Sequence, residues 1–408
     1  MAASELPFIL DRGCGLDVHK DNVVASIKGK DIQSETRTFN TFTEDLYGLV
    51  GWLQNHGITH LAMESTGVYW KPVHNILEEF FEIILVNARH VKNVPGQKTD
   101  KKDSEWIAKL LLSGLLKGSF VPEQSIRELR HLNRHRRKLI GMRTSEKNRL
   151  QNVLEDANIK IGSVLSDVFG VSGLSMVKAL AAGQTAPVAL SDLAKGSLVK
   201  KKPLLIKALN GKVTAHHRFM LNMILSSIEN INDQIAQLEA QMDKYKLQYK
   251  EQIKLLQTIP GVSSKIATGM IAEIGTDMSQ FPSHSHLASW AGVCPGNNES
   301  AGKKYSSKTT HGNKYLKTTL VEAAWAASRS KSYPILANKH RSIAARRGKK
   351  KATMAIAHKI LTAAYHIMRD MQPYQPSVKD KAIMEKRRLK RIERLEKQLS
   401  TLKKTSYN

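Results

Sequence analysis

Residues 13–86 contain the pattern that decides the fold, beginning with GCGLDVH at 13–19 and ending with IILV at 83–86. Across this region and just beyond it, short apolar runs alternate with segments of helical periodicity. The predicted strands cover 13–19, 22–28, 33–39, 59–63 and 83–86, and the predicted helices cover 44–54, 71–80 and 103–116. Three strands, a helix, and then strand, helix, strand, helix is the element order of a ribonuclease-H-like α/β fold.

The chain beyond this region is predicted to be mostly helical. Residues 123–156 have the pattern of one long basic helix. Apolar residues farther along recur at alternating spacings of four and three, which is a heptad seam suited to pairing with another helix. The seam consists of Ile224, Ile228, Ile231, Ile235, Leu238, Met242 and Tyr245. Its partner could be the 123–156 helix of the same chain or the same helix of a second subunit.

Residues 252–275 read as a helix, a Pro-Gly-Val turn and a second helix. This is the pattern of a helix-hairpin-helix, whose turn offers backbone N–H groups to a phosphate, and equally the pattern of a tight helical corner. A polar loop is expected at 295–312 and a helix at 313–330. Residues 161–207 are irregular, and their pattern predicts no particular structure.

Four parts follow from these patterns. An α/β domain covers 1–122, and an all-α region with the basic helix, the irregular insert and the heptad coiled coil covers 123–250. A mostly helical domain with the helix-hairpin-helix covers 251–375. A basic helical tail covers 376–408, and it could be a solvated helix, a nucleic-acid arm or an oligomer contact.

The charge of the chain indicates its partner. Lysine and arginine number 63 against 36 acidic residues, giving a formal net charge of +27. A polyanion is the natural partner, and nucleic acid is favoured over an acidic membrane surface. No apolar run approaches the roughly 20 residues of a membrane-spanning helix, and neither a signal peptide nor a cysteine framework is recognisable, so a cytoplasmic protein without a membrane partner is expected. The candidate nucleic-acid contacts are Arg134, Arg136, Arg137, Lys303, Lys304, Lys314, Arg346 and Arg347.

Four carboxylates occupy positions suited to phosphodiester chemistry. Asp17 lies at the end of the first predicted strand, Glu64 follows the fourth, and Asp100 and Asp103 stand three apart at the start of a helix. In a ribonuclease-H-like sheet the first and fourth strands are neighbours and the last helix crosses near their ends, so the four groups are expected to converge. Carboxylates are hard oxygen ligands, which favours Mg²⁺ or Mn²⁺ as the cofactor.

Three motifs carry a family resemblance. The phrases GLDVHKD at 15–21, MESTGVYWKP at 63–72 and LVNARHVKNVPGQKTDKKDSEWIAKLL at 85–111 resemble the DEDD transposases of bacterial insertion sequences, in the insertion sequence one-ten family with its eleven-eleven branch. The resemblance runs from about 13 to 156 and from 255 to 368. It implies an N-terminal domain like the RuvC Holliday-junction resolvase, whose acidic tetrad matches Asp17, Glu64, Asp100 and Asp103 and binds the metal ions.

The second half of the resemblance concerns a serine. Residues 291–324 are similar to the family's C-terminal transposase domain, in which a serine attacks DNA and forms a covalent link. The matching residue is Ser300. Ala301 stands between this serine and the following glycine, which is a departure from the family pattern, and Ser306 and Ser307 are the nearby alternatives. A serine hydroxyl needs a base or a metal to become a good nucleophile, and the acidic tetrad could supply that metal.

The resemblance also implies partners and a location. The expected activity is cleavage and exchange of strands between element and target double-stranded DNA in the bacterial cytoplasm, at the nucleoid. Family members are directed by an element-encoded noncoding guide RNA, which would make base pairing the source of sequence recognition. A homo-oligomer, dimer or tetramer, is expected because four strands are exchanged. The alternatives are a metal-dependent, structure-selective nuclease that resolves branched DNA without the serine, and a non-catalytic nucleic-acid scaffold.

Overall fold

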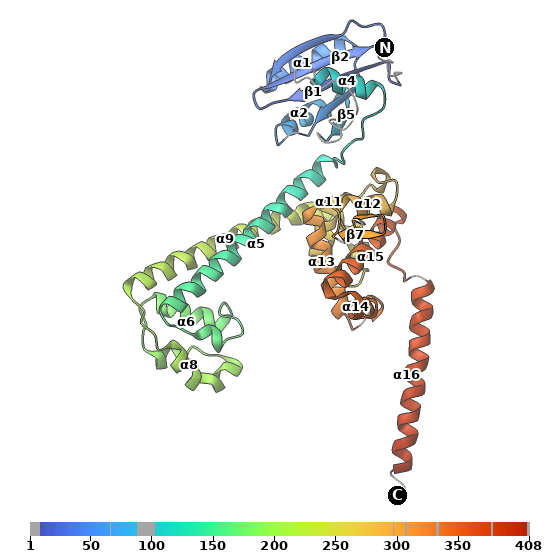
Figure 1. The fold of residues 1–408 in the computed structure, drawn as a ribbon. Coiled ribbons are helices and arrows are strands. Elements are labelled where there is room, and N and C mark those ends of the chain that lie inside the picture. The colour runs from blue at the N-terminus through green and yellow to red at the C-terminus, as the bar shows by residue number, and fades with distance from the viewer. Residues whose placement is uncertain are drawn as a thin grey trace. The chain divides into compact units, whose positions relative to one another are not determined.

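The computed structural model describes residues 9–65, 67–87, 103–296, 298–306, 308–331, 334–376 and 378–405. The chain divides into two compact units, Met1–Val121 and Pro122–Asn408 (Figure 1). The first is an α/β unit and the second is mostly helical, as the sequence predicts. The predicted division of 123–408 into three parts stays a prediction.

The first unit contains a five-stranded mixed sheet with the strand order β3-β2-β1-β4-β5. Its strands are β1 (Arg12–Val18), β2 (Asn22–Gly29), β3 (Glu35–Asn40), β4 (His60–Glu64) and β5 (Glu82–Val86). The first three strands pair antiparallel in series, whereas β4 lies parallel to both β1 and β5. All five predicted strands are present, and β1 and β4 are neighbours as predicted.

Helices cover both faces of this sheet. Helices α1 (Thr43–Asn55) and α2 (Trp70–Leu77) supply apolar side chains to the core on one face, where Leu16 and Met63 lie. Helix α4 (Asp103–Leu112) covers the other face, where it packs against Ala62. The two faces separate because successive residues of a strand point to opposite sides of the sheet.

A long helical hairpin begins the second unit. Helices α5 (Gln124–Asp156) and α9 (Ala215–Gln248) pack along each other (Figure 1), with Leu139 of α5 buried against Ile231 and Ile235 of α9. The heptad seam therefore has an intramolecular partner, which decides between the two pairings that the sequence left open. Arg136 of α5 adds an ion pair with Glu239 of α9, at 2.6 Å.

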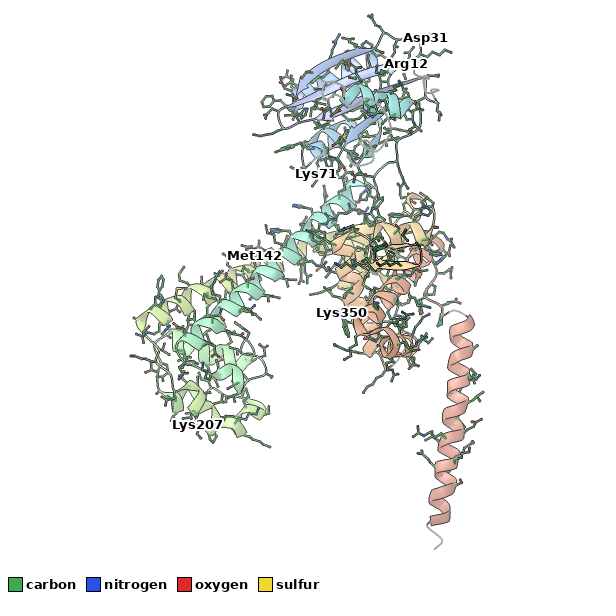
Figure 2. The ribbon with its side chains drawn as sticks, viewed as in Figure 1. Arg12, Asp31, Lys71, Met142, Lys207 and Lys350 are labelled. Carbon is green, nitrogen blue, oxygen red and sulfur yellow. The ribbon has the colours of Figure 1, made fainter. Side chains whose placement is uncertain are left out.

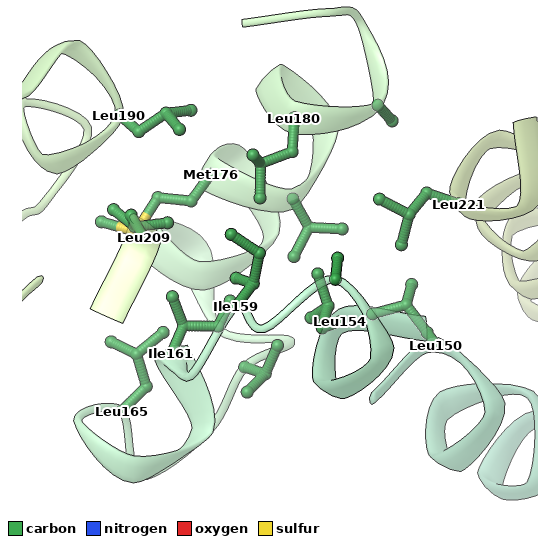
Figure 3. Packing of buried hydrophobic residues seen from close by; sticks show 14 of the residues in the cluster. Leu150, Leu154, Ile159, Ile161, Leu165, Met176, Leu180, Leu190, Leu209 and Leu221 are labelled. Atoms are coloured by element: carbon green, nitrogen blue, oxygen red, sulfur yellow. The ribbon is translucent and has the colours of Figure 1, made fainter. Parts of the chain in front are cut away.

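Residues 157–213, which we call the cap, connect α5 to α9. The cap contains η2 (Ile161–Ser163), α6 (Val171–Ala181), α7 (Pro187–Ser191), η3 (Gly196–Lys201) and α8 (Lys202–Leu209). Its apolar side chains form one core with the end of α5 and the start of α9 (Figure 3). The region whose sequence predicts no structure is thus a compact helical assembly. Its elements are too short for a clear periodic pattern.

The remaining elements of the second unit form a helical part and a separate C-terminal helix. They are α10 (Lys250–Leu256), α11 (Ser264–Ile274), η4 (Met278–Gln280), α12 (His284–Trp290), α13 (Lys314–Arg329), α14 (Pro334–Arg347), α15 (Lys349–Asp370) and α16 (Val378–Thr405). A small hairpin of β6 (Asn298–Ser300) and β7 (Lys303–Ser306) lies within 295–312, where a polar loop was expected. Among the described residues, no helix is long and apolar enough to span a membrane.

The turn between α10 and α11 packs tightly against α13. Gly261 has a φ of +89°, and a Cβ added there would lie 2.5 Å from both the Ala323 carbonyl oxygen and the Ala327 nitrogen. Only glycine permits that approach, so the turn is a tight helical corner. Whether it also binds a phosphate, as in a helix-hairpin-helix, stays a prediction.

Candidate functional site

Two of the predicted carboxylates lie next to each other at the sheet. In the parallel pairing of β1 with β4, Leu16 is opposite Met63, and the next residue along each strand is Asp17 and Glu64. Asp17 comes two residues after Gly15, and Glu64 comes two residues after Ala62. Gly15 and Ala62 both face α4, and residues two apart on a strand point to the same side of the sheet. Asp17 and Glu64 therefore project toward the α4 side of the sheet.

Helix α4 approaches this face at Gly15. A Cβ added to Gly15 would lie 2.1 Å from the Ser104 carbonyl oxygen and 2.4 Å from the Ala108 nitrogen, so the backbones of α4 and β1 touch. Farther along the helix, the Leu111 side chain lies 3.0 Å from the corresponding position at Gly13. Helix α4 thus runs antiparallel to β1, and its first residue, Asp103, lies toward Asp17.

A buried hydrogen bond fixes the start of α4 to the sheet. The hydroxyls of Ser104 and Ser26, on β2, lie 2.8 Å apart. The next residue of α4, Glu105, has its carboxylate 3.7 Å from the Nζ atom of Lys28 on β2. These contacts hold the first turn of α4, and hence the backbone of Asp103, against β2, while the approach at Gly15 holds it against β1.

The carboxylates brought to this region fit a hard divalent cation by donor chemistry. The Asp17 side chain is 27% exposed and lies 3.1 Å from the Nε2 atom of His19. Asp100, the fourth predicted ligand, lies outside the described residues. Among the described residues, no three acidic, histidine or cysteine side chains are arranged to hold a metal. The structure therefore places Asp17 and Glu64 on adjacent strands and Asp103 at the start of the helix that packs over them, and the described residues form no metal site.

The predicted nucleophile, Ser300, is exposed at the tip of the β6–β7 hairpin. It pairs with Lys303 across a two-residue turn formed by Ala301 and Gly302. These turn residues have φ values of 50° and 75°. Positive φ at both positions is what a type I′ hairpin turn requires, and it suits glycine, asparagine or aspartate better than alanine.

An aromatic side chain that the sequence analysis missed accompanies this serine. Tyr305 is two residues beyond Lys303 on β7, so both side chains belong to the face of the hairpin that carries Ser300. Tyr305 is 63% exposed. A single tyrosine directly after two lysines, within an otherwise polar loop, was the available signal. Of the alternative serines, Ser306 accepts a hydrogen bond from the Lys308 backbone N–H at 3.2 Å, and Ser307 lies outside the described residues.

The base of the loop that carries the hairpin is closed by backbone contacts. The N–H of Asn313 donates to the Trp290 carbonyl oxygen at 3.2 Å. Gly292 and Gly312 approach so closely that a Cβ on Gly312 would lie 2.3 Å from the Gly292 nitrogen. These contacts hold the two ends of the loop together, so the hairpin is attached to the helices at a fixed position.

A fully buried carboxylate lies beneath this loop. Glu273 of α11 is 0% exposed and accepts two hydrogen bonds from the Arg134 guanidinium, at 2.9 and 2.7 Å. Asn313 donates to the same carboxylate at 2.6 Å while its Oδ1 atom accepts the N–H groups of Tyr315 and Leu316, which caps α13. Glu273 was not among the residues predicted from the sequence, although a glutamate within the apolar run of α11 was a visible signal.

Arg130 adds a second cation beside the carboxylate. Its guanidinium donates to the carbonyl oxygens of Ala272 and Glu273, at 2.8 and 3.0 Å. Burial lowers the pKa of Arg130 to about 10, against the opposing effect of Glu273. Helices α5, α11 and α13 are therefore joined by one buried polar network.

The basic residues predicted to contact nucleic acid fall into two groups. The three arginines of α5 have protein partners: Arg134 binds Glu273, Arg136 binds Glu239, and Arg137 donates to the Tyr315 carbonyl oxygen at 2.9 Å. These contacts support a structural role, and their role in nucleic-acid binding stays a prediction. Exposed residues of the second group are Lys303, Lys314, Arg346 and Arg347, while the side chain of Lys304 lies outside those described.

Comparison with known proteins identifies the class. A DEDD family model described as a transposase matches residues 14–159, and a model of the Transposase IS116/IS110/IS902 family matches residues 253–341. The first range contains β1 to α5, and the second contains α11 to α13 with the serine hairpin. The chain is thus an enzyme of DNA transposition and recombination. It belongs to the IS110 family of transposases, as the sequence motifs predict.

Two relatives extend the similarity over most of the chain. They are the pilin gene-inverting proteins of Moraxella lacunata and Moraxella bovis, each 23% identical over 385 residues. Each alignment covers 89% of this chain and 98% of the relative. The similarity therefore includes the cap, most of which lies outside both family models.

Proposed function

We propose that this transposase cuts and rejoins DNA with a metal-binding carboxylate set, Asp17, Glu64, Asp100 and Asp103, and with Ser300 as a covalent nucleophile. The first unit is then a ribonuclease-H-like domain of the RuvC type. The observation that carries the proposal is the approach of α4 to β1 at Gly15, because it directs the start of α4 toward the adjacent ends of β1 and β4.

The carboxylates act by holding charge in place. A bound Mg²⁺ or Mn²⁺ would neutralise charge on the scissile phosphate and lower the pKa of a coordinated hydroxyl. Asp17 and Glu64 would provide oxygen ligands from adjacent strands, and Asp103 would provide one from the helix docked above them. Asp100 completes the set of four in this proposal.

Ser300 forms the covalent link. Its Oγ attacks phosphorus and loses its proton to a base, while the bond from phosphorus to the departing strand breaks and that strand's oxygen takes up a proton. Attack on the phosphoserine by a hydroxyl of the new strand restores the serine and the phosphodiester. The number of phosphodiester bonds is conserved, so no ATP is needed.

Neighbours of Ser300 on the hairpin serve the DNA. Lys303 offers a cation to the phosphate being attacked. Tyr305, exposed on the same face, stacks on a nucleobase beside the cut, an interaction worth about 1–3 kcal/mol per base in single-strand-binding proteins. We further propose, from the family resemblance, that an element-encoded noncoding RNA provides sequence recognition and that a dimer or tetramer performs the exchange.

The test is a search for a covalent protein–DNA adduct in cells that carry the whole element. Protein is recovered under denaturing conditions, digested and mapped for the residue that bears a nucleotide. We expect the adduct on Ser300, its loss in both Ser300→Ala and Asp103→Asn, and its retention in Ser306→Ala. Tyr305→Ala is expected to lower the adduct yield about tenfold or more, and Tyr305→Phe to preserve it, because stacking needs only the ring.

The alternative is a structure-selective nuclease that uses the carboxylates alone. It is favoured by the exposure of Ser300, for which no contact with a histidine or carboxylate is seen among the described residues. Absence of any adduct, with metal-dependent nicking of branched DNA that survives Ser300→Ala, would establish the nuclease and reject the serine mechanism.

A further inference from the structure

The cap carries an uneven distribution of charge. Residues 157–213 contain eight lysines but only two acidic residues, Asp167 and Asp192. Five of the lysines fall between positions 195 and 207, namely Lys195, Lys200, Lys201, Lys202 and Lys207. The positive charge of the cap is therefore concentrated on η3, α8 and the residue before them.

Most of these lysines have no carboxylate partner. Lys202 pairs with Asp192 at 2.9 Å, which uses the one acidic side chain near the run. Lys195, Lys200, Lys201 and Lys207 are exposed, and among the described residues no carboxylate forms an ion pair with any of them. Four like charges close together repel one another, and an anionic partner would relieve that repulsion.

The run also has a defined outward face. Leu205, Ala208 and Leu209 are buried in the core of the cap, which fixes the rotation of α8. Of these, Leu209 is labelled in Figure 3. Lys207 of α8 is exposed on the side of the helix away from these buried residues, and Lys200, which belongs to η3, is exposed as well. Lys207 lies on the surface of the cap (Figure 2).

We propose that this face, Lys195 to Lys207, binds the phosphate backbone of a nucleic-acid duplex. The segment KGSLVKKKPLLIK contains no arginine, asparagine or glutamine, the side chains best suited to reading base edges. Lysine ammoniums act as point charges toward phosphates, which gives affinity without sequence preference. The proposal is independent of Ser300 and the carboxylates, since it concerns where the duplex is held and not how it is cut.

Binding of phosphates predicts a specific dependence on salt. Each phosphate contact releases counterions and contributes about 0.9 to the slope of log affinity against log salt concentration for duplex DNA. Replacing Lys195, Lys200, Lys201 and Lys207 together by glutamine in the full chain removes four such contacts. We expect the slope to become shallower by about 3 to 4.

The measurement is fluorescence anisotropy over a salt series with a duplex DNA of random sequence and, separately, a duplex RNA of equal length. The matched control replaces four lysines that already have carboxylate partners, namely Lys160, Lys178, Lys246 and Lys265. Both variants lose four positive charges, but the control lysines already form ion pairs with carboxylates of the protein. Its slope should change by less than about 1.

Each outcome is decisive once thermal melting shows that both variants are folded. If the slope becomes shallower only in the variant that lacks Lys195, Lys200, Lys201 and Lys207, the result supports binding of a duplex to this face. The duplex whose slope changes more is then its partner. Equal changes in both variants would mean that only total charge matters, and would overturn the proposal. An unchanged slope in the variant that lacks the four lysines of the proposed face would overturn it as well. So would a variant that loses binding to vesicles of acidic phospholipid but still binds DNA and RNA as the parent does.

Discussion

The two regions that carry the candidate residues are held in place by different physics. In the first unit, Asp17 and Glu64 stand on interior strands and Asp103 begins α4, which is held against β1 by backbone contact at Gly15. The serine of the second unit stands on an exposed hairpin above a buried ionic network centred on Glu273. The position of the carboxylates should therefore be sensitive to added side-chain volume, whereas the position of the serine hairpin should be sensitive to the loss of a buried charge.

This difference suits the two proposed tasks. Ligands of a metal ion must keep fixed distances, which close-packed strands and helices provide. A serine that attacks a phosphate within a bulky duplex must be accessible, so it stands on a tip and only the base of its loop is held rigidly. Three substitutions break or sharpen this comparison.

The largest effect is expected from Glu273→Ala. This substitution removes the fully buried bidentate partner of the half-buried Arg134 guanidinium and an acceptor of Asn313. Removing one member of a buried ion pair costs about 3–5 kcal/mol. The free energy of unfolding, from denaturant titration, should fall by that amount.

The control for this prediction is Glu322→Ala. Glu322 lies 3.5 Å from Arg137 but its side chain is 57% exposed, so its loss should change stability by less than about 1 kcal/mol. Glu273→Gln, which keeps the volume but removes the charge, should lie between the two. Equal stability of the Glu273→Ala and Glu322→Ala proteins would show that the network does not hold the second region.

A slightly smaller effect is expected from Gly15→Ala. The added methyl group would lie 2.1 and 2.4 Å from backbone atoms of α4, which cannot rotate away, so the helix must move as a whole. We expect a loss of about 3 kcal/mol, at the upper end of overpacking costs, together with loss of metal-dependent strand cleavage. Thermal unfolding and a nicking assay measure the two.

Gly48→Ala in α1 is the matched control. It adds the same methyl group to a position with nothing within 4 Å, and alanine is the better helix former by about 1 kcal/mol. That variant should be as stable as the parent or more so. If Gly15→Ala also left stability and cleavage intact, close backbone contact would not be what positions the carboxylates.

The smallest effect is expected from Ala301→Asn. Asparagine tolerates the positive φ of this turn position better than alanine does, and Asn-Gly is the favoured pair for such turns. The hairpin should gain about 0.5–1 kcal/mol, which slows amide exchange within β6 and β7 by about two- to fivefold. Exchange elsewhere should not change.

Gly302→Ala provides the reverse test. Gly302 has a φ of +75° and no neighbour within 4 Å, so the methyl group adds backbone strain and no clash. Amide exchange in the hairpin should then be faster than in the parent. Identical exchange in both variants would show that the turn does not control the order of the hairpin.

Local patterns predicted the first unit well. Alternating apolar residues within β1 and β2 and the short apolar run of β4 specify strands directly, and the order of elements along the chain specifies which strands are neighbours. The proximity of Asp17 and Glu64 followed from that order. The docking of α4 at Gly15 could not be predicted, because a glycine in a strand does not reveal which backbone approaches it.

The second unit was less predictable because its structure depends on long-range contacts. The heptad seam of α9 indicated a helical partner, but only the fold shows that α5 supplies it. The cap gathers its core from several short elements that are individually ambiguous. The hairpin at Ser300 has strands of three and four residues and an alanine where its turn would favour glycine or asparagine, so its sequence resembles a loop.

The continuity of α5 has a consequence for the geometry of DNA binding. One uninterrupted helix connects Arg134, which binds Glu273, to Leu154, which lies in the core of the cap. At about 1.5 Å per residue these positions are about 30 Å apart, close to the length of one turn of duplex DNA. Helix α5 therefore sets the spacing between the Glu273 network and the core of the cap. A duplex that contacted both places would do so about one turn apart, and each residue inserted into α5 would lengthen that spacing by about 1.5 Å.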